Sequence, residues 1–442
     1  MKKYYLLTTV IVLILQIFIS AQSNDQILFN NVKVFDGKSA ELSPLVNVLI
    51  EGNKIKQISP DVIQTTKNTQ IINGNGKTLM PGLIDVHIHL VFGSMTMQDL
   101  MSPNLSEEFI IKQASINAEK MLLRGFTAVR DVGGPIFPIK AGIDAGKIMG
   151  PRIWPAGATI SQTGGHGDFR TPDEKSRKFF GKVSRAELYG ATFIADGKDE
   201  VLTAVRENLR SGASFLKLMA GGGTSSEYDP VDVTQYTLEE MKAAVEAAED
   251  WGTYVTVHAY TPRAVRKAID AGVKCIEHGQ MLDEETLRLI KEKDVWLSLQ
   301  VLRESTPDMS PSRLEKRKPV IEGQPKVWAK AIELGIKLAW GTDFLFEPDM
   351  NDEQNDYILL LSQWMEPSEI LKLVTYDNAQ LLKLSGLRSP YKGELGVIEE
   401  GALADLILVD GNPLEDISII GNPEKKFEVI MKDGKIYKNT LK

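Results

Sequence analysis

Cysteine and histidine are scarce in this 442-residue chain. The single cysteine, Cys275, excludes an internal disulfide framework and a zinc site built from thiolates. Basic residues are outnumbered by acidic ones, 51 to 59, which argues against a nucleic-acid partner because phosphate binding needs clustered Lys and Arg. With 43% hydrophobic residues the composition is that of a soluble globular protein, and not of a disordered or polytopic membrane chain. Only five histidines occur, so their positions are informative.

The N-terminus carries an uninterrupted apolar run. Residues 1–21 combine two lysines, that run and a small-residue end, Ile19-Ser20-Ala21, which predicts a secretory signal peptide. The alternative is an uncleaved membrane anchor, but the run falls short of the ~20 residues that a membrane span needs. We therefore expect an exported protein, periplasmic or secreted, with no membrane association after cleavage.

One structural unit recurs from residue 82 to about 345: an apolar strand, a loop, an amphipathic helix and a glycine. This α/β alternation predicts a parallel sheet, and eight units predict a closed (β/α)8 barrel, or TIM barrel. A doubly wound open sheet is the competing fold, but the glycine-rich phosphate motif that it needs after the first strand is missing. The eight expected strands are Leu83–Leu90, Phe126–Val132, Ile153–Ile160, Phe215–Ala220, Tyr254–Tyr260, Lys274–His278, Val295–Leu302 and Lys337–Phe344.

The two ends of the chain have a different pattern. Residues 27–80 and 394–437 alternate short β-type runs with turn residues, and neither end has enough apolar residues for a core of its own. We expect both ends to form one small β-sandwich domain beside the barrel. The expected division is a signal peptide at 1–21, the β-domain at 22–80 and 391–442, and the barrel at 81–390.

Four of the five histidines and one aspartate fall at expected strand ends. His87 and His89 are two residues apart on the first strand, so they project from the same face and can grip a metal ion together. His258, His278 and Asp343 end the fifth, sixth and eighth strands, at the barrel edge where such residues converge. A lone histidine is more often a satisfied core residue, but this set at this edge favours a metal centre.

Lys217 lies inside the apolar strand Phe215–Ala220. A buried ammonium without a partner costs several kcal/mol or loses its proton, and a neutral amine can react with carbon dioxide. The resulting carbamate is an anionic ligand with two oxygens that could bridge two cations. The alternative is a lysine paired with a nearby carboxylate.

Two segments carry a resemblance to a known family. PGLIDVHIHL at 81–90 closely matches the first-strand signature of the amidohydrolase superfamily of binuclear metallohydrolases, and GALADLILVD at 401–410 resembles the segment where that family's β-domain resumes. The resemblance spans residues 27–437.

The resemblance implies a role for each strand-end residue. It implies two divalent metal ions, the more buried one bound by His87 and His89 and the other by His258 and His278. Carboxylated Lys217 would bridge them, and Asp343 would contact a bridging hydroxide and act as the acid and base. Histidine and carboxylate ligands suit zinc, with manganese and cobalt as alternatives.

Within the superfamily, the chain is similar to the branch of imidazolonepropionase-like proteins, Xaa-Pro dipeptidases, related carboxypeptidases and ochratoxin-type amidases. Three segments carry this similarity: Gly164–Asp168, Lys217–Gly223 and His258–Tyr260. It implies an enzyme that hydrolyses an amide bond in a dipeptide or an N-acyl amino acid. A lactam, lactone or phosphoester hydrolase and a non-catalytic binding barrel stay open as alternatives, as does a homo-oligomer.

Substrate contacts are expected from two long loops, 161–198 and 303–324, which leave the carboxyl ends of their strands. His166 lies between glycines in the first loop, and Tyr260 should share a strand face with His258. We expect these two residues to hold a substrate carboxylate, helped by Arg170 or Arg303. The glycines at 221–223 are expected to leave room for substrate at the barrel rim.

Overall fold

The computed structural model describes residues 26–226, 228–305 and 309–441. The predicted signal peptide lies outside these residues. None of the helices in the described ranges is both long and apolar enough to cross a membrane.

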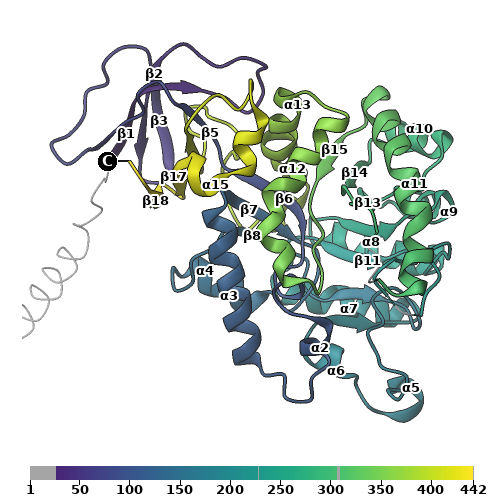
Figure 1. Cartoon of the computed structure of the whole chain (residues 1–442). Helices are drawn as coiled ribbons and strands as arrows, with labels where there is room; N and C mark the ends of the chain where they lie inside the picture. Colours follow the sequence, from purple (N-terminus) through teal and green to yellow (C-terminus); the bar gives the residue numbers. More distant parts are fainter. Residues whose placement is uncertain (1–25, 227, 306–308, 442) are drawn as a thin grey trace, which may run out of the picture.

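Both ends of the chain contribute strands to one eight-stranded mixed sheet, with the order β18-β17-β16-β5-β1-β2-β3 and β4 paired with β1 (Figure 1). The two ends join where β5 pairs with β16 in antiparallel register. Side chains from both halves share one core, which includes Phe29 and Val48 as well as Leu406 and Val429. The predicted β-domain built from both chain ends is thereby confirmed. Its strands are β1 (Gln26–Val34), β2 (Val46–Glu51), β3 (Lys54–Ser59), β4 (Gln70–Asn73), β5 (Thr78–Pro81), β16 (Leu406–Val409), β17 (Phe427–Lys432) and β18 (Lys435–Asn439).

The middle of the chain forms the predicted barrel of parallel strands. Two sheets make it up, β6-β7-β8 and β10-β9-β11-β12-β13-β14-β15. The ring closes between its first and last strands, where the backbone N–H of Asp343 donates to the carbonyl of His87 at 2.8 Å. The strands are β6 (Leu83–Ile88), β7 (Phe126–Asp131), β8 (Arg152–Pro155), β9 (Thr159–Ser161), β10 (Thr192–Ile194), β11 (Leu216–Met219), β12 (Val255–Ala259), β13 (Cys275–His278), β14 (Trp296–Leu299) and β15 (Leu338–Trp340).

The third expected strand is divided into β8 and β9, which pair with β7 and β11 respectively. Gly157 has a φ of 80° between them, a conformation that ends a strand. The peptide groups freed at this break are bound by Asn208, which both accepts from the N–H of Ala158 and donates to its carbonyl. The side chain of Asn208, on α7 (Lys198–Arg210), therefore takes the place of the strand-to-strand hydrogen bonds at this break.

Helices surround the barrel, and several begin at residues that cap free backbone N–H groups. Thr237 forms a capping box with Glu240 at the start of α8, and Asp283 caps α10. The α-helices are α2 (Met97–Leu100), α3 (Glu107–Leu123), α4 (Phe137–Asp144), α5 (Arg177–Phe180), α6 (Arg185–Leu188), α7 (Lys198–Arg210), α8 (Leu238–Asp250), α9 (Pro262–Asp270), α10 (Glu284–Glu292), α11 (Pro311–Glu333), α12 (Gln354–Leu359), α13 (Pro367–Lys372), α14 (Asn378–Leu382) and α15 (Pro423–Lys426). Shorter 3-10 and π segments are η1 (Phe92–Ser94), η2 (Pro348–Glu353), η3 (Leu360–Gln363), η4 (Leu373–Asp377), η5 (Lys383–Arg388) and η6 (Ile417–Gly421).

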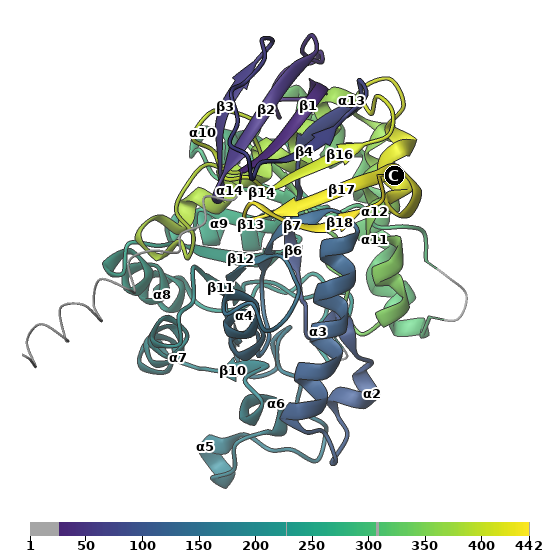
Figure 2. The same cartoon turned by 90° about the vertical axis from the view of Figure 1, so that its left-hand side faces the viewer.

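The two long loops differ in structure. The first carries the short helices α5 and α6, which project from the barrel on the side away from the β-domain (Figures 1 and 2). The second was expected to be loop through residue 324, but most of it is the first half of α11. Pro319 and Pro325 lie inside this helix, and prolines normally break helices, which is why the sequence pattern hid it.

Candidate metal centre and substrate pocket

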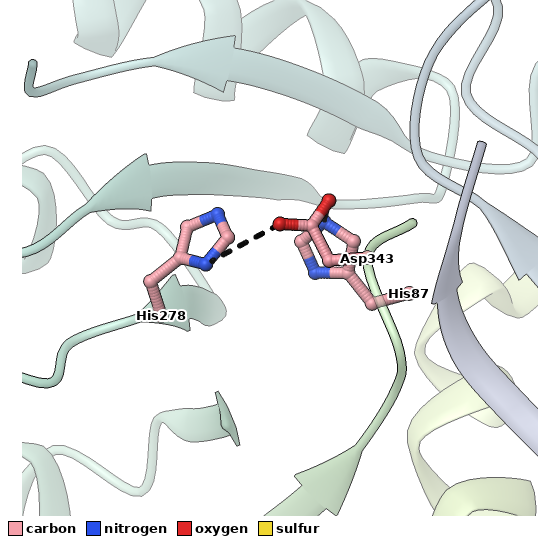
Figure 3. Close-up of side chains that lie close together, drawn as sticks. All are labelled: His87, His278 and Asp343. Carbon is pink, nitrogen blue, oxygen red and sulfur yellow. Dashed lines mark ion pairs between the residues drawn. The ribbon is translucent and has the colours of Figure 1, made fainter. Parts of the chain in front are cut away.

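Every strand-end residue singled out from the sequence lines one small cavity of about 30 Å³ at the carboxyl ends of the strands. A space of this size can hold a water molecule or an ion. Figure 3 shows three of these residues, from β6, β13 and the turn after β15, converging on one point. The polar lining residues are His87, His89, His166, Lys217, His258, His278 and Asp343, with Thr159 and Ser225.

His87 directs an electron lone pair into this cavity. Its Nδ1 lies 2.8 Å from the Oε2 atom of Glu277 and 3.0 Å from the Nε2 atom of Gln300. In the tautomer that donates Nδ1–H to the shorter contact, the Glu277 carboxylate, Nε2 carries no proton. Nε2 is buried, makes no hydrogen bond within the described residues, and lies 3.2 Å from the Oδ1 atom of Asp343. Two acceptor atoms this close repel each other unless a proton or a metal cation lies between them.

Two more imidazoles follow the same scheme. The Nδ1–H of His89 donates to the carbonyl of Gly133 at 2.9 Å, so Nε2 faces Asp343 Oδ1 across 3.4 Å. The Nε2–H of His258 donates to the carbonyl of Gly222 at 3.0 Å, which leaves Nδ1 without a proton and with a free lone pair. Each ring therefore has one nitrogen tied to the protein and one available to a metal ion, the arrangement that histidine ligands require.

His278 and Asp343 are held in a backbone conformation that is rare for residues with a side chain. Their φ angles are 77° and 57°, in the left-handed region. The His278 Nδ1 and Asp343 Oδ2 atoms lie 3.9 Å apart (Figure 3). Together with His87, these residues offer three ligand atoms within 4.8 Å of one another. Such backbone strain is characteristic of functional sites, where the surrounding structure enforces it.

Lys217 lies on β11 with only 1% of its surface exposed. Burial lowers the pKa of its ammonium, although Glu277 and Asp343 act in the opposite direction. Among the described residues, no carboxylate forms an ion pair with it, so the alternative of a carboxylate-paired lysine has no support in the structure. The amine therefore lies in the cavity in a setting that favours its neutral form.

The charges of the cavity suit a divalent cation. Burial alone would raise the pKa of Asp343, but His87 and the other imidazoles hold it well below its ordinary value. Burial lowers the pKa of His258 and of His278. It acts to lower the pKa of His87 as well, but Asp343 and Glu277 overcome burial and raise it. Ionised carboxylate and neutral imidazole are the donors that a divalent transition metal takes. The carboxylates that raise the pKa of His87 attract a metal cation as they attract a proton, so the residues present fit a metal centre.

Glu277 and Arg130 support the centre, and the sequence reasoning missed both. Glu277 is fully buried and joins His87 to Arg130, whose Nη2 donates to Oε1 at 2.5 Å. Alternation along β13 would put Glu277 and His278 on opposite faces, but the positive φ of His278 breaks that alternation. The available signal was a charged residue inside each apolar strand, Glu277 in CIEH and Arg130 in FTAVRD.

A larger pocket of about 260 Å³ opens beside the metal centre and shares His258 and Asp343 with it. His166 and Tyr260 also line this pocket, as expected. The His166 ring stacks on His258 at 4.0 Å, and its Nδ1 lies 2.8 Å from the hydroxyl of Ser226. The Tyr260 ring lies 5.0 Å from that of His278.

The two arginines expected to assist are placed differently. Arg303 lines the 260 Å³ pocket, but its guanidinium pairs with Glu353 and stacks on Tyr357 at 4.6 Å. Arg170 lines a neighbouring pocket and donates twice to Asp168, at 2.7 and 2.5 Å. The structure therefore brings His166 and Tyr260 to the metal centre, places a neutralised Arg303 in the adjoining pocket, and does not bring Arg170 there.

The glycines at 221–223 were expected to leave room for substrate, and for Gly222 and Gly223 that expectation is wrong. A Cβ atom on Gly223 would lie 1.9 Å from the His166 ring, and one on Gly222 would lie 1.8 Å from the Pro230 carbonyl oxygen. The space made by these glycines is filled by the protein itself. Gly223, which has no side chain, lets the His166 ring pack against His258.

Similarities to known proteins cover the fold and the site together. A model of the amidohydrolase family matches residues 78–439. The ochratoxinase of Aspergillus niger is 32% identical over 376 residues, 81% of this chain and 75% of the relative. A solved prolidase complexed with N-methylphosphonate-L-proline is 31% identical with a TM-score of 0.85, and a Xaa-Pro dipeptidase with methionine bound in its active site is 31% identical with a TM-score of 0.80. Both superpositions cover 94% of this chain and 100% of the other.

Proposed function

The chain belongs to the amidohydrolase family, as its first-strand segment predicted, and from this premise we propose that it is a metal-dependent enzyme that cleaves the amide bond of a small peptide-like substrate. The observation that carries the proposal is the tautomer pattern at the barrel edge. His87, His89 and His258 each donate one N–H to a fixed acceptor and turn the other nitrogen to the same cavity. None of these three nitrogens accepts a hydrogen bond from a described residue, so their lone pairs are available to metal ions.

Two divalent ions, zinc by preference, would be held by the side chains named above. His87 and His89 would bind one ion, and His258 and His278 the other. Lys217 would bridge them as a carbamate: its neutral amine forms a C–N bond to carbon dioxide and releases one proton. When bound, such ions lower the pKa of water towards neutrality and polarise a carbonyl group.

Asp343 is the proposed general base and acid. Its low pKa keeps the carboxylate ionised at neutral pH, so it can accept a proton from the attacking water. It lines both the metal cavity and the larger pocket, so the same group can pass that proton to the leaving nitrogen of the substrate. His166 and Tyr260 line the larger pocket and can donate hydrogen bonds to a substrate oxygen.

The substrate is proposed to be a dipeptide or an N-acyl amino acid. The pocket volume of about 260 Å³ lies just below the ~300–1,000 Å³ of pockets for drug-sized ligands, which suits a molecule of this size. The names of the related prolidase and Xaa-Pro dipeptidase support the same class. We further propose that residues 1–21 direct export, which N-terminal sequencing of the mature protein tests.

The test compares two buried lysines. The purified protein should contain close to two divalent ions per chain. Lys217→Ala should lose both the metal ions and amide hydrolysis, and added short carboxylic acids should restore part of the activity. Lys432→Met is the matched control, because Lys432 is also buried but donates to the Gly150 carbonyl at 2.6 Å, away from the site. Full activity of the wild-type protein in strong chelator, or of Lys217→Ala, would contradict the proposal.

A further inference from the structure

Three guanidinium groups line the pocket beside the metal centre, and two of them are neutralised by partners in the chain. Arg303 pairs with Glu353, and the Nη2 atom of Arg313 lies 2.9 Å from Glu347 Oε1. The third is Arg317, one turn beyond Arg313 on α11. It differs from the other two in its partners and in its burial.

Arg317 is 91% buried, with 9% of its surface exposed, and its described contacts are with uncharged groups. Its Nε–H donates to the hydroxyl of Ser305 at 3.1 Å, and Nη2 donates to the carbonyl of Arg303 at 2.9 Å. These bonds occupy the Nε/Nη2 edge of the guanidinium. The other edge consists of Nη1 and the second N–H of Nη2, and neither donates to the described residues beyond the bonds just named. This edge matches a carboxylate with two parallel bonds.

We propose that Arg317 binds the free carboxylate of the substrate and so restricts the enzyme to amides that end in a carboxylic acid. Because the other two arginines are paired with carboxylates, Arg317 is the lining arginine that keeps its charge available to an anionic group among the described residues. Its remaining lining includes apolar side chains, which suit an uncharged neighbour to that carboxylate: Leu302, Met309, Phe344, Leu345, Met350 and Tyr357.

This assignment rests on the proposed amide hydrolysis and adds the residue that selects its substrate. It also replaces the sequence-based expectation for the assisting arginine. Arg170 and Arg303 could bind a substrate carboxylate only by leaving Asp168 and Glu353, whereas Arg317 has no such bond to break among the described residues. His166 and Tyr260 would then orient the carbonyl end of the substrate near the metal centre.

The experiment uses pairs of probes that differ only in the carboxylate: L-alanyl-L-proline and its C-terminal amide, and N-acetyl-L-phenylalanine and its amide. Arg317→Gln should lower kcat/KM for the acids on the order of 100-fold, as expected for a buried charge pair that loses one partner, and change the amides little. Arg313→Gln is the matched control on the same helix and should keep the wild-type preference. Arg317→Lys keeps the positive charge but cannot form two parallel bonds to a carboxylate, so it should retain part of the preference for acids. This variant provides the test if Arg317→Gln fails to fold.

Binding gives a readout that does not depend on turnover. Calorimetric titration of the metal-loaded Asp343→Asn protein should show tighter binding of each acid than of its amide, and Arg317→Gln in that background should remove the difference. Equal binding of acid and amide, or equal losses from Arg317→Gln and Arg313→Gln, would overturn the role of Arg317. Failure of the proposed function is distinct, because the wild-type protein would then cleave neither acid nor amide in the presence of metal.

Discussion

Two clusters of buried charge in this molecule differ in whether their hydrogen-bonding groups are satisfied. The first, which we call the metal-centre cluster, consists of His87, His89, Lys217, His258, His278 and Asp343. The second, which we call the interdomain cluster, joins Arg152 of β8 to Asp405 and Asp433 of the β-domain. Arg152 donates to Asp405 at 2.9 and 3.1 Å and to Asp433 at 2.7 Å, while Asp433 also accepts from Asn53 at 2.9 Å. In the interdomain cluster, opposite charges meet directly with good hydrogen-bond geometry.

The comparison separates structural burial of charge from functional burial. Arg152 and Asp405 are as deeply buried as His89 and His278, so burial alone does not distinguish the two clusters. What distinguishes them is that His87, His89 and His278 of the metal-centre cluster each face Asp343 with a ring nitrogen that makes no hydrogen bond to another residue. A protein that needed only stability would pair these groups or replace them with apolar residues. Buried ring nitrogens without hydrogen-bond partners are therefore the feature that indicates a functional site.

The largest expected effect is on catalysis. Asp343→Asn should lower kcat/KM roughly 10²–10⁴-fold, because an amide cannot accept the proton of water, while the metal content stays near that of the wild type. Steady-state kinetics and elemental analysis on the same preparation measure both. Asp352→Asn, at an exposed residue of η2, is the control. Near-normal turnover of Asp343→Asn would move the acid and base role to another residue.

Substitutions in the interdomain cluster should lower the free energy of unfolding and leave catalysis unchanged. Arg152→Met leaves two carboxylates without their partner, and breaking a buried pair in this way costs about 3–5 kcal/mol of the free energy of unfolding. Chemical denaturation measures the loss, and Arg152→Met combined with Asp405→Asn should recover part of it. The metal content and kcat/KM per folded molecule should remain unchanged. A loss of metal in Arg152→Met would show that the two clusters are coupled.

The metal-centre cluster was largely predictable from the sequence, because its members sit at strand ends and the fold type sets which ends converge. His87, His258 and Asp343 needed only the strand periodicity and the barrel rule that carboxyl ends meet. Arg317 was not predictable, since prolines hid its helix and its importance depends on which neighbouring arginines have carboxylate partners. The role of Gly223 was also missed, because a glycine in a sequence does not reveal which side chain fills its space.

The supporting layer of the metal centre gives a smaller effect. Glu277→Gln should weaken metal binding about 10–100-fold, because an amide can present its NH₂ group to His87 Nδ1 and no longer fixes the tautomer. Competition with a chelator of known affinity measures the change. Glu292→Gln, on the exposed end of α10, is the control. Unchanged metal affinity in folded Glu277→Gln would mean that the His87 tautomer is set without Glu277.

The smallest expected effect is the pH response of the interdomain cluster. Burial acts to raise the pKa of Asp433, but the hydrogen bond from Asn53 and the charge of Arg152 lower it below its ordinary value. A carboxyl group whose pKa is lower in the folded state stabilises the protein above its unfolded pKa, and this contribution is lost as the pH falls through the folded pKa. The free energy of unfolding should therefore fall more steeply between about pH 5 and pH 3 in the wild type than in Asp433→Asn. Because the Asp433 side chain is 40% exposed, added salt should reduce the difference. Parallel pH profiles of the two proteins at low salt would show that the contacts of Asp433 contribute nothing measurable, and that Asp405 alone holds Arg152 in this cluster.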